Sequence, residues 1–135
     1  MESCIFCKII AGEIPARKIL ETERTLAFLD INPMTEGHTV VIPKEHAETL
    51  DTLPEHVIPE YFRDLKAVAK LLKEKLNLKG YNLLQNNGKV AWQEVPHMHF
   101  HIIPRREEDR MAAVRLPKLD VTAEDLDKLL EKIQK

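Results

Sequence analysis

The sequence predicts one antiparallel α+β domain. The chain has 135 residues, which is enough for one hydrophobic core and too few for two ordinary domains. Apolar segments of strand length follow one another with brief connections, and one long segment among them has helical periodicity. Because no repeat, low-complexity tract or linker-like stretch divides the chain, we expect residues 1–135 to form a single domain. Its informative motifs lie within about residues 4–106, and 107–135 form a C-terminal extension.

Five strands are expected where β-branched and apolar residues lie between glycine, proline and asparagine. They cover residues 17–21, 25–30, 38–42, 81–85 and 98–103. In the third of these, His38 shares a face with Val40 and Ile42, because alternate strand residues point the same way.

Helices are expected at three places. Residues 4–11 suit a short helix that ends at Gly12. The long helix covers about residues 59–77, because apolar residues recur there every three or four positions. That stripe consists of Phe62, Leu65, Ala69, Leu72 and Leu76. Thr122, with Asp125 three residues later, is expected to cap a short C-terminal helix.

Composition excludes several classes of protein. The net charge is −2, from 20 basic and 22 acidic residues, and only 5% of residues are aromatic. A nucleic-acid partner is therefore not expected. No apolar run approaches the roughly 20 residues that span a bilayer, and the N-terminus lacks the pattern of a secretion signal. We expect a cytoplasmic protein without a membrane partner, in which Cys4 and Cys7 bind metal, act in redox chemistry or pack as thiols.

Three of the six histidines lie within five residues. On a strand His97, His99 and His101 occupy one face, with neighbours about 7 Å apart. The opposite face is apolar and consists of Met98, Phe100 and Ile102. Imidazoles in strict alternation pack poorly unless their nitrogens are used, so this face is expected to be a site. Two chemistries remain open: the imidazoles could bind a catalytic zinc ion, or one could be a nucleophile that attacks phosphorus.

The order of motifs resembles the histidine triad (HIT) superfamily, in its Hint-like branch and of bacterial or archaeal type. The resemblance rests on the His-x-His-x-His strand and on three further blocks. These blocks read C-I-F-C-K-I-I-A-G-E-I-P-A from Cys4, L-D-I-N-P from Leu29 and G-H-T-V-V-I-P-K-E-H from Gly37. It implies a HIT-like α+β fold, with a five-stranded antiparallel sheet, one long helix and short helices. It also implies a homodimer in which two such sheets join.

The resemblance implies a nucleotide hydrolase or transferase, either a nucleoside phosphoramidase or a dinucleoside polyphosphate hydrolase. His99 is the implied nucleophile, which forms a nucleotidyl-histidine intermediate at the α-phosphate and then releases a nucleoside monophosphate. His101 is expected to bind phosphate oxygens, and a backbone carbonyl of the same strand is expected to orient the ring of His99. His38 and His97 belong to the same catalytic group. The resemblance implies a reaction that requires no metal and no organic cofactor.

The resemblance also assigns a purine nucleotide to a set of residues in this chain. Asn86, Gln93 and Val95 match positions around the phosphate and the leaving group, together with His99 and His101. Asp30 matches the carboxylate that accepts ribose hydroxyls. The apolar cleft for the base is expected from Phe6, Ile14, Phe28 and Ile31.

The chain departs from the family pattern at two positions. Trp92 stands where many members have glycine, and Glu94 stands where some have serine or threonine. A carboxylate repels phosphate, and glycine permits the closest backbone approach. A nucleotide-binding regulator with little catalysis is therefore the alternative to an enzyme.

A second constellation of residues suits tetrahedral zinc. It consists of Cys4, Cys7, His46 and His97. Spacing alone does not establish this site, because the histidines are remote from the cysteines in sequence. The resemblance implies a structural zinc ion there, away from the nucleophile. Redox chemistry and simple packing of the two thiols are the alternatives, and His56 receives no role.

Overall fold

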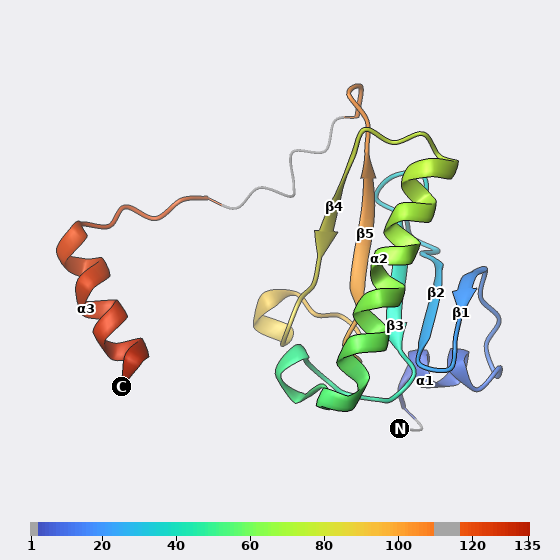
Figure 1. Cartoon of the computed structure of the whole chain (residues 1–135), viewed down its shortest axis with the longest axis horizontal. Helices are drawn as coiled ribbons and strands as arrows, with labels where there is room; N and C mark the ends of the chain where they lie inside the picture. The colour runs from blue at the N-terminus through green and yellow to red at the C-terminus, as the bar shows by residue number, and fades with distance from the viewer. Residues whose placement is uncertain (1–2, 110–116) are drawn as a thin grey trace.

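The computed structural model describes residues 3–109 and 117–135. Within them, five antiparallel strands form one sheet in the order β1-β2-β3-β5-β4 (Figure 1). The strands are β1 (Lys18–Glu21), β2 (Thr25–Leu29), β3 (Thr39–Pro43), β4 (Gly80–Leu84) and β5 (Phe100–Arg105). The predicted five-stranded antiparallel sheet is confirmed. The largest shift is in β5, which begins two residues later than expected.

Three α-helices lie in the described residues, as the sequence predicts. They are α1 (Ile5–Ile10), α2 (Ile58–Lys75) and α3 (Ala123–Gln134). Short 3₁₀ turns, which were not predicted, connect the larger elements at Leu50–Thr52, Glu55–Val57 and Lys89–Ala91. Pro59 lies in the first turn of α2, where the missing N–H costs no helical hydrogen bond. Figure 1 shows α2 lying along one face of the sheet.

The sheet is covered on both faces, so its central strands are more buried than an alternating pattern would require. α2 packs on one face with Ala27, Val41 and Ile102. α1 contributes Phe6 and Ile9 to a second cluster that includes alternate residues of β2 and β3. Leu26, Phe28, Val40 and Ile42 are those residues. Two-sided burial explains why β2 and β3 read as nearly continuous apolar runs.

The buried stripe of α2 differs from the predicted one. Tyr61, Leu65, Val68, Ala69 and Leu72 are its buried residues. Phe62, which the periodicity places in the core, is 37% exposed, and Tyr61 is fully buried instead. The Tyr61 hydroxyl donates a hydrogen bond of 2.7 Å to the carbonyl oxygen of Val41. A tyrosine can be buried completely when its hydroxyl finds such a partner, so the prediction is wrong for Phe62, whereas Leu65, Ala69 and Leu72 are buried as predicted.

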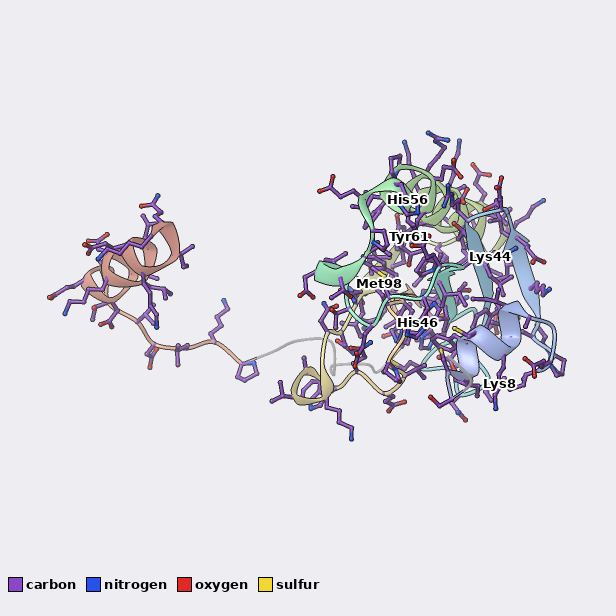
Figure 2. The ribbon with its side chains drawn as sticks, turned by 90° about the horizontal axis from the view of Figure 1, so that it is seen from below. Lys8, Lys44, His46, His56, Tyr61 and Met98 are labelled. Carbon is purple, nitrogen blue, oxygen red and sulfur yellow. The ribbon has the colours of Figure 1, made fainter. Side chains whose placement is uncertain are left out.

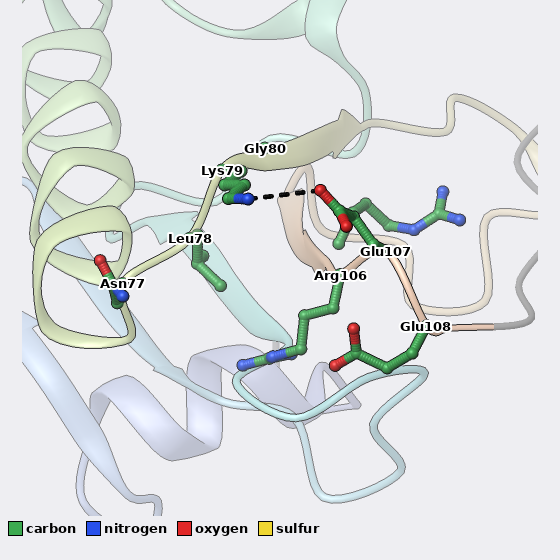
Figure 3. Close-up of a pocket in the computed structure, with 8 residues that line it drawn as sticks. Asn77, Leu78, Lys79, Gly80, Arg106, Glu107 and Glu108 are labelled. Atoms are coloured by element: carbon green, nitrogen blue, oxygen red, sulfur yellow. Dashed lines mark hydrogen bonds and ion pairs between the residues drawn. The ribbon is translucent and has the colours of Figure 1, made fainter.

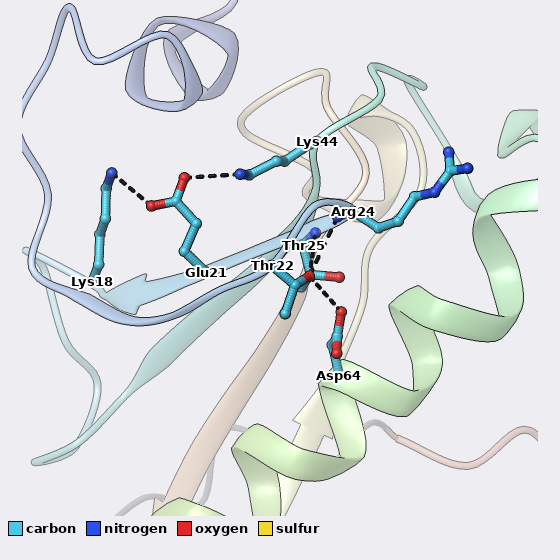
Figure 4. Close-up of polar contacts among 7 residues, drawn as sticks. All are labelled: Lys18, Glu21, Thr22, Arg24, Thr25, Lys44 and Asp64. Atoms are coloured by element: carbon cyan, nitrogen blue, oxygen red, sulfur yellow. Dashed lines mark hydrogen bonds and ion pairs between the residues drawn. The ribbon is translucent and has the colours of Figure 1, made fainter.

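Polar contacts fix the β1–β2 turn against α2 (Figure 4). The Thr22 hydroxyl donates to Asp64 Oδ2 at 2.8 Å and accepts the backbone N–H groups of Arg24 and Thr25. Glu21 lies between Lys18 and Lys44, with N–O distances of 3.0 and 2.8 Å. These ion pairs are solvent-exposed, so the buried contacts of α2 contribute more to stability.

Gly37 is a position where a side chain would destabilise the fold. Its φ is +93°, and an added Cβ would lie 2.6 Å from Leu76 Cδ1 and 3.2 Å from Pro104 Cγ. We expect Gly37→Ala to lower the free energy of unfolding by about 2–3 kcal/mol, as backbone strain and overpacking combine. Urea denaturation measures this loss. The matched control is Gly12→Ala, which has φ +82° and open space around the new methyl group. Equal losses in the two variants would contradict a role for the contact with Leu76.

The C-terminal helix begins as predicted. Thr122 accepts the N–H of Asp125 at 3.1 Å, and the Asp125 carboxylate accepts the N–H of Thr122 at 3.0 Å. All of α3 is exposed to solvent. The predicted extension 107–135 also contains residues 110–116, which lie outside the described part of the chain. Among the described helices, none combines the length and the apolar character needed to cross a membrane.

Candidate active site

The predicted histidine strand lies partly ahead of β5. Phe100 is the first residue of β5, so His97 and His99 belong to the segment that leads into it. The predicted alternation of faces persists through that segment. Met98 and Ile102 are fully buried in the cluster on the α2 face. On the other face, the Phe6 ring makes edge contacts with His97 and His99, with ring centroids 5.7 and 5.0 Å apart.

His99 is oriented by the backbone of its own segment. Its Nδ1–H donates a hydrogen bond of 2.7 Å to the carbonyl oxygen of His97. Since a carbonyl can only accept, this bond places the proton of the neutral ring on Nδ1 and the lone pair on Nε2. Burial lowers the pKa of His99, whose side chain is buried. A neutral imidazole with a free Nε2 lone pair is the form required for nucleophilic attack.

A chain of hydrogen bonds fixes His101 in the opposite tautomer. The backbone N–H of Met34 donates to Nδ1 of His38 at 3.0 Å, so the neutral His38 ring carries its proton on Nε2. That Nε2–H points at His101 Nδ1, at 2.9 Å. His101 must accept there, which leaves its own proton on Nε2 as a donor. Burial lowers the pKa of both rings, so both are neutral near pH 7.

This arrangement argues against a catalytic metal among Asp30, His38 and His101, although their ligand atoms lie within 4.8 Å of one another. A metal bound to His38 Nε2 would require the proton to move to Nδ1. Nδ1–H would then face the N–H of Met34, and two donors would oppose each other. The strand histidines do not converge on one metal either, because His97 is turned toward the cysteines. The catalytic-zinc alternative therefore loses its geometric support.

The four predicted structural zinc ligands do come together. Cys4 Sγ lies 3.3 Å from His97 Nδ1, Cys7 Sγ lies 3.3 Å from His46 Nδ1, and the two Nδ1 atoms are 3.1 Å apart. Ligand atoms around tetrahedral zinc are separated by about 3.3–3.8 Å, given the usual bond lengths. His97 Nε2–H donates to the carbonyl oxygen of Pro43 at 2.8 Å, so its Nδ1 lone pair faces the sulfurs. The donor set and the tautomer both fit a zinc ion.

Protonation of these ligands in the metal-free protein is consistent with that assignment. Burial, together with the neighbouring Cys4 thiol, raises the pKa of the Cys7 thiol to about 11. Burial lowers the pKa of His97 to about 4. The imidazole is thus already in its ligating form, and a metal would displace thiol protons on binding. Figure 2 shows His46 on the α1 side of the domain, whereas His56 lies elsewhere and pairs with Glu45 at 2.8 Å.

The structure brings together most of the residues predicted for the base cleft. Phe6, Ile14 and Phe28 lie in or against the apolar cluster on the α1 face, and Val95, which was predicted for the phosphate site, packs against the same cluster. Ile31 does not join them, because its side chain is 81% exposed. Asp30 Oδ2 lies 3.5 Å from His38 Nε2, whereas Asp30 Oδ1 accepts the N–H of Asn32 at 2.8 Å. One carboxylate oxygen therefore caps the turn and the other faces the histidines.

The β4–β5 connection carries the remaining predicted residues, and Gln93 has a bracing role there. Its Oε1 accepts the N–H of Gly88 at 2.7 Å, and its Nε2 donates to the carbonyls of Glu48 and Val95 at 2.7 and 2.9 Å. Both amide hydrogens are used, so the side chain offers no free donor to a phosphate. Asn86 Nδ2 donates to the Trp92 carbonyl at 3.4 Å. A contact of either side chain with nucleotide stays a prediction.

Sequence reasoning missed the backbone partners that set the tautomers of His97 and His38. The carbonyl of Pro43 and the N–H of Met34 orient His97 and His38, and no residue type reveals them. Phe6 was expected to contact the base, but its ring also packs against His99. An aromatic residue in the C-I-F-C block was the available signal for that contact.

A separate hollow lies at the other end of the β4–β5 pair (Figure 3). Its lining includes Gly80 and Arg105. These two residues form a cross-strand pair four residues along the β4–β5 ladder from the pair that contains His101. Lys79 pairs with Glu107, and Arg106 with Glu36. These cations already have acidic partners, and the hollow contains none of the histidines.

The depressed pKa of His101 predicts a pH-dependent stability. Burial lowers this pKa from 6.5 to about 4, so between these values the unfolded chain binds the proton that the folded chain does not. The free energy of unfolding should therefore fall by about 2 kcal/mol between pH 7 and pH 5 on account of this ring. His101→Gln should remove that share of the loss. Urea titrations of both proteins at the two pH values measure it, and parallel losses would contradict the assignment.

Comparison with known proteins places the chain in a family. The HIT domain model matches residues 11–108. An uncharacterised HIT-like protein of Methanocaldococcus jannaschii is 50% identical over 97% of this chain and 98% of its own length. The adenosine 5'-monophosphoramidase of Saccharomyces cerevisiae is 46% identical over 94% of this chain and 78% of its own. A crystal structure of a Bacillus subtilis HIT family member superposes with a TM-score of 0.89 at 41% identity, covering 98% and 95% of the two chains. The chain belongs to the HIT family.

Proposed function

We propose that this protein is a nucleotide hydrolase that acts at the α-phosphate of a nucleoside phosphoramidate or related nucleotide, through a covalent intermediate on His99. One observation carries the proposal. The hydrogen bond from His99 Nδ1–H to the His97 carbonyl leaves Nε2 unprotonated in a buried, neutral ring. The class of nucleotide hydrolase, expected from the sequence, is confirmed by relatives such as the yeast adenosine 5'-monophosphoramidase.

Two displacements at phosphorus complete the reaction. His99 Nε2 attacks the α-phosphorus, a P–N bond to the ring forms, and the bond to the leaving group breaks. The departing amine takes a proton from solvent, and His101 Nε2–H is placed by its tautomer to hydrogen-bond a phosphate oxygen as charge develops. Water then attacks phosphorus and releases a proton to solvent, and the P–N bond to His99 breaks. The nucleoside monophosphate leaves and the imidazole is restored.

The nucleoside is proposed to lie on the β2–β3 side of His99. Asp30 has one carboxylate oxygen turned toward the histidines, where it can accept ribose hydroxyls. Phe6 and Phe28, with ring centroids 5.7 Å apart, form an apolar wall suited to a purine. The Ile31 side chain is exposed, so it could contact the base only from the solvent side.

We assign a structural zinc ion to Cys4, Cys7, His46 and His97. The converging donor atoms support this assignment. The metal would fix the segment that supplies the His97 carbonyl, and it takes no part in the displacements. Two free thiols in the described part of the chain are compatible with a reducing cytoplasm.

A homodimer through the free edge of the sheet is proposed as well. β4 is an edge strand, and Tyr81 and Leu83 on it are partly exposed, as is Phe62 on α2. Such an apolar edge favours pairing with a second copy. Sedimentation equilibrium would test this, because a monomer at micromolar concentration contradicts it.

Rapid-quench mass spectrometry tests the proposed reaction. The protein is mixed with adenosine phosphoramidate and quenched within milliseconds, and peptides are searched for a nucleotidyl group on His99. Turnover with an adduct that survives prior chelation supports the proposal. Turnover that chelation abolishes would support metal-dependent hydrolysis instead. Binding of AMP without adduct or turnover would identify a nucleotide-binding regulator.

A further inference from the structure

The C-terminal helix α3 has an apolar face that its own domain does not cover. Its large apolar side chains lie three or four positions apart and form one stripe, which we call the α3 stripe. It consists of Leu126, Leu129, Leu130 and Ile133. Each of these residues is more than half exposed, and every described residue from 117 to 135 is exposed. Neither core cluster of the described residues includes a residue of α3.

A helix of this length needs a packing partner. α3 has 12 residues. Isolated helices shorter than about 12–15 residues are marginal in water, and most helical stability in proteins comes from packing of the apolar face. The capping box of Thr122 and Asp125 favours the first turn, but a cap contributes far less than a buried face. The α3 stripe is therefore expected to be covered in the native protein.

α3 lies on the side of the molecule where the sheet ends at β4. This strand is an edge of the sheet, and Figure 1 shows α3 beyond it, away from both the sheet and α2. Figure 2 shows the same separation from a view at right angles. A fully extended chain from Arg105 to Ala123 would span at most about 60 Å, whereas a domain of this size is roughly 35 Å across. The connection is therefore long enough to carry α3 over a neighbouring domain.

Solved structures place this helix in the same position. The Bacillus subtilis HIT family chain aligns over 98% of this chain with a TM-score of 0.89. A Streptococcus mutans chain, 38% identical, aligns over 99% of this chain and 85% of its own length with a TM-score of 0.92. Residues 117–135 are too large a share of the chain for such scores if α3 lay elsewhere in those two proteins. Because crystals of two different proteins share the position, the neighbour that holds α3 is one that both possess, and a second copy of the chain meets that condition.

We propose that α3 is an exchanged arm, which crosses the β4 edge and packs the α3 stripe on a second copy of this chain. This inference rests on the homodimer of the proposed function and deepens it. In a two-fold dimer the contact is made twice, so both arms are covered and neither is left to recruit further copies. A lipid surface fits less well, because α3 carries more acidic than basic side chains and anionic membranes attract basic helices.

Isotope-coded cross-linking tests where α3 lies. Unlabelled and ¹⁵N-labelled protein are mixed until their copies have exchanged, and an amine-reactive reagent then joins neighbouring lysines. Links from Lys128 or Lys132 of α3 to lysines before residue 106 should join a labelled copy to an unlabelled one. Lys18 and Lys44 both contact Glu21 within one chain, so their link is the internal control and should join residues of equal label. Links from α3 to the domain that occur only within one copy would overturn the inference.

Substitution of the α3 stripe tests whether that face makes the contact. In Leu126→Ser/Leu130→Ser, the rate at which labelled and unlabelled copies exchange should rise by about 100-fold, because both arms lose two buried leucines and affinity changes appear mostly in dissociation. The matched control is Lys128→Ser/Glu131→Ser, which places two serines on the opposite face of α3. Its exchange rate should stay close to that of the parent. Equal rates in the two variants would overturn the inference, since the helix and not its apolar face would then be responsible.

Oligomeric state and turnover keep the inference separate from the proposed function. A dimer that hydrolyses adenosine phosphoramidate, but whose exchange rate is unchanged in the stripe variant, overturns the inference alone, whether or not mixed links form. A monomeric parent overturns the inference together with the homodimer, and leaves the reaction on His99 to the rapid-quench experiment. If α3 yields no cross-link at all, the exchange rates decide. Faster exchange in the stripe variant only would support the arm, and unchanged exchange would overturn it.

Discussion

Replacing His99 by asparagine is expected to lower kcat by ~10⁴-fold or more, since it removes the attacking atom of a covalent mechanism. The substitution is chosen for its geometry. The asparagine amide N–H₂ can take the place of Nδ1–H and donate to the His97 carbonyl, which the native ring contacts at 2.7 Å. The buried pocket therefore keeps a satisfied donor, and what is lost is the Nε2 lone pair. Steady-state hydrolysis of adenosine phosphoramidate measures the effect.

Folding and nucleotide binding provide the controls for this variant. The thermal midpoint of His99→Asn should stay near that of the parent, and AMP should still bind, because Asp30 and the apolar wall are untouched. His101→Gln should lower kcat by less, about 10²-fold, because it removes one hydrogen-bond donor to the developing charge and leaves the nucleophile in place. A residual rate in His99→Asn equal to that of His101→Gln would show that His99 is not the covalent residue.

The sequence predicts the elements of the fold well because local signals specify them. Strand boundaries follow from turn residues, and Thr122 with Asp125 specifies the start of α3. The buried face of α2 was less predictable. Tyr61 and Phe62 are adjacent and both aromatic, and only the Val41 carbonyl, supplied by β3, decides that the tyrosine is buried. A helix face set by a tertiary hydrogen bond is not encoded in periodicity alone.

The candidate site, like the fold, was predictable from the sequence only in part. The residue types and their order identify the histidines, but the tautomers depend on backbone groups that residue types do not reveal. His46 and His97 are 51 positions apart, yet their Nδ1 atoms lie 3.1 Å from each other. They meet because β3 and β5 pair antiparallel, so the segment after β3 and the segment before β5 reach the same end of the sheet. Strand pairing had to be known before those distances could be derived.

Removing the proposed zinc ligand Cys7 is expected to destabilise the whole domain. Cys7→Ser should lose the bound zinc, and an ion held at a thousand times its Kd contributes about 4 kcal/mol to the free energy of unfolding. For a chain of this length the thermal midpoint should fall by about 10 °C or more. Cys7 is a cleaner choice than Cys4, because Cys4 is almost completely buried and its sulfur also caps α1 by accepting the N–H of Cys7 at 3.4 Å. Elemental analysis and calorimetry measure the two effects.

A comparison of the parent protein, His99→Asn and Cys7→Ser distinguishes a structural role of the zinc ion from a catalytic one. His99→Asn should retain one zinc ion per chain, whereas Cys7→Ser should retain none. In Cys7→Ser the His97 carbonyl still accepts the His99 N–H, so below its lower midpoint the variant should turn over substrate far faster than His99→Asn. Chelation of the parent protein should reproduce the loss of stability with the same partial retention of rate. If Cys7→Ser keeps its zinc, or if chelation leaves the thermal midpoint unchanged, the four ligands do not hold a structural metal.

A second outcome concerns the role of the metal. If zinc removal and His99→Asn lower kcat equally, the metal belongs to the reaction, because a purely structural ion would leave the Nε2 lone pair in place.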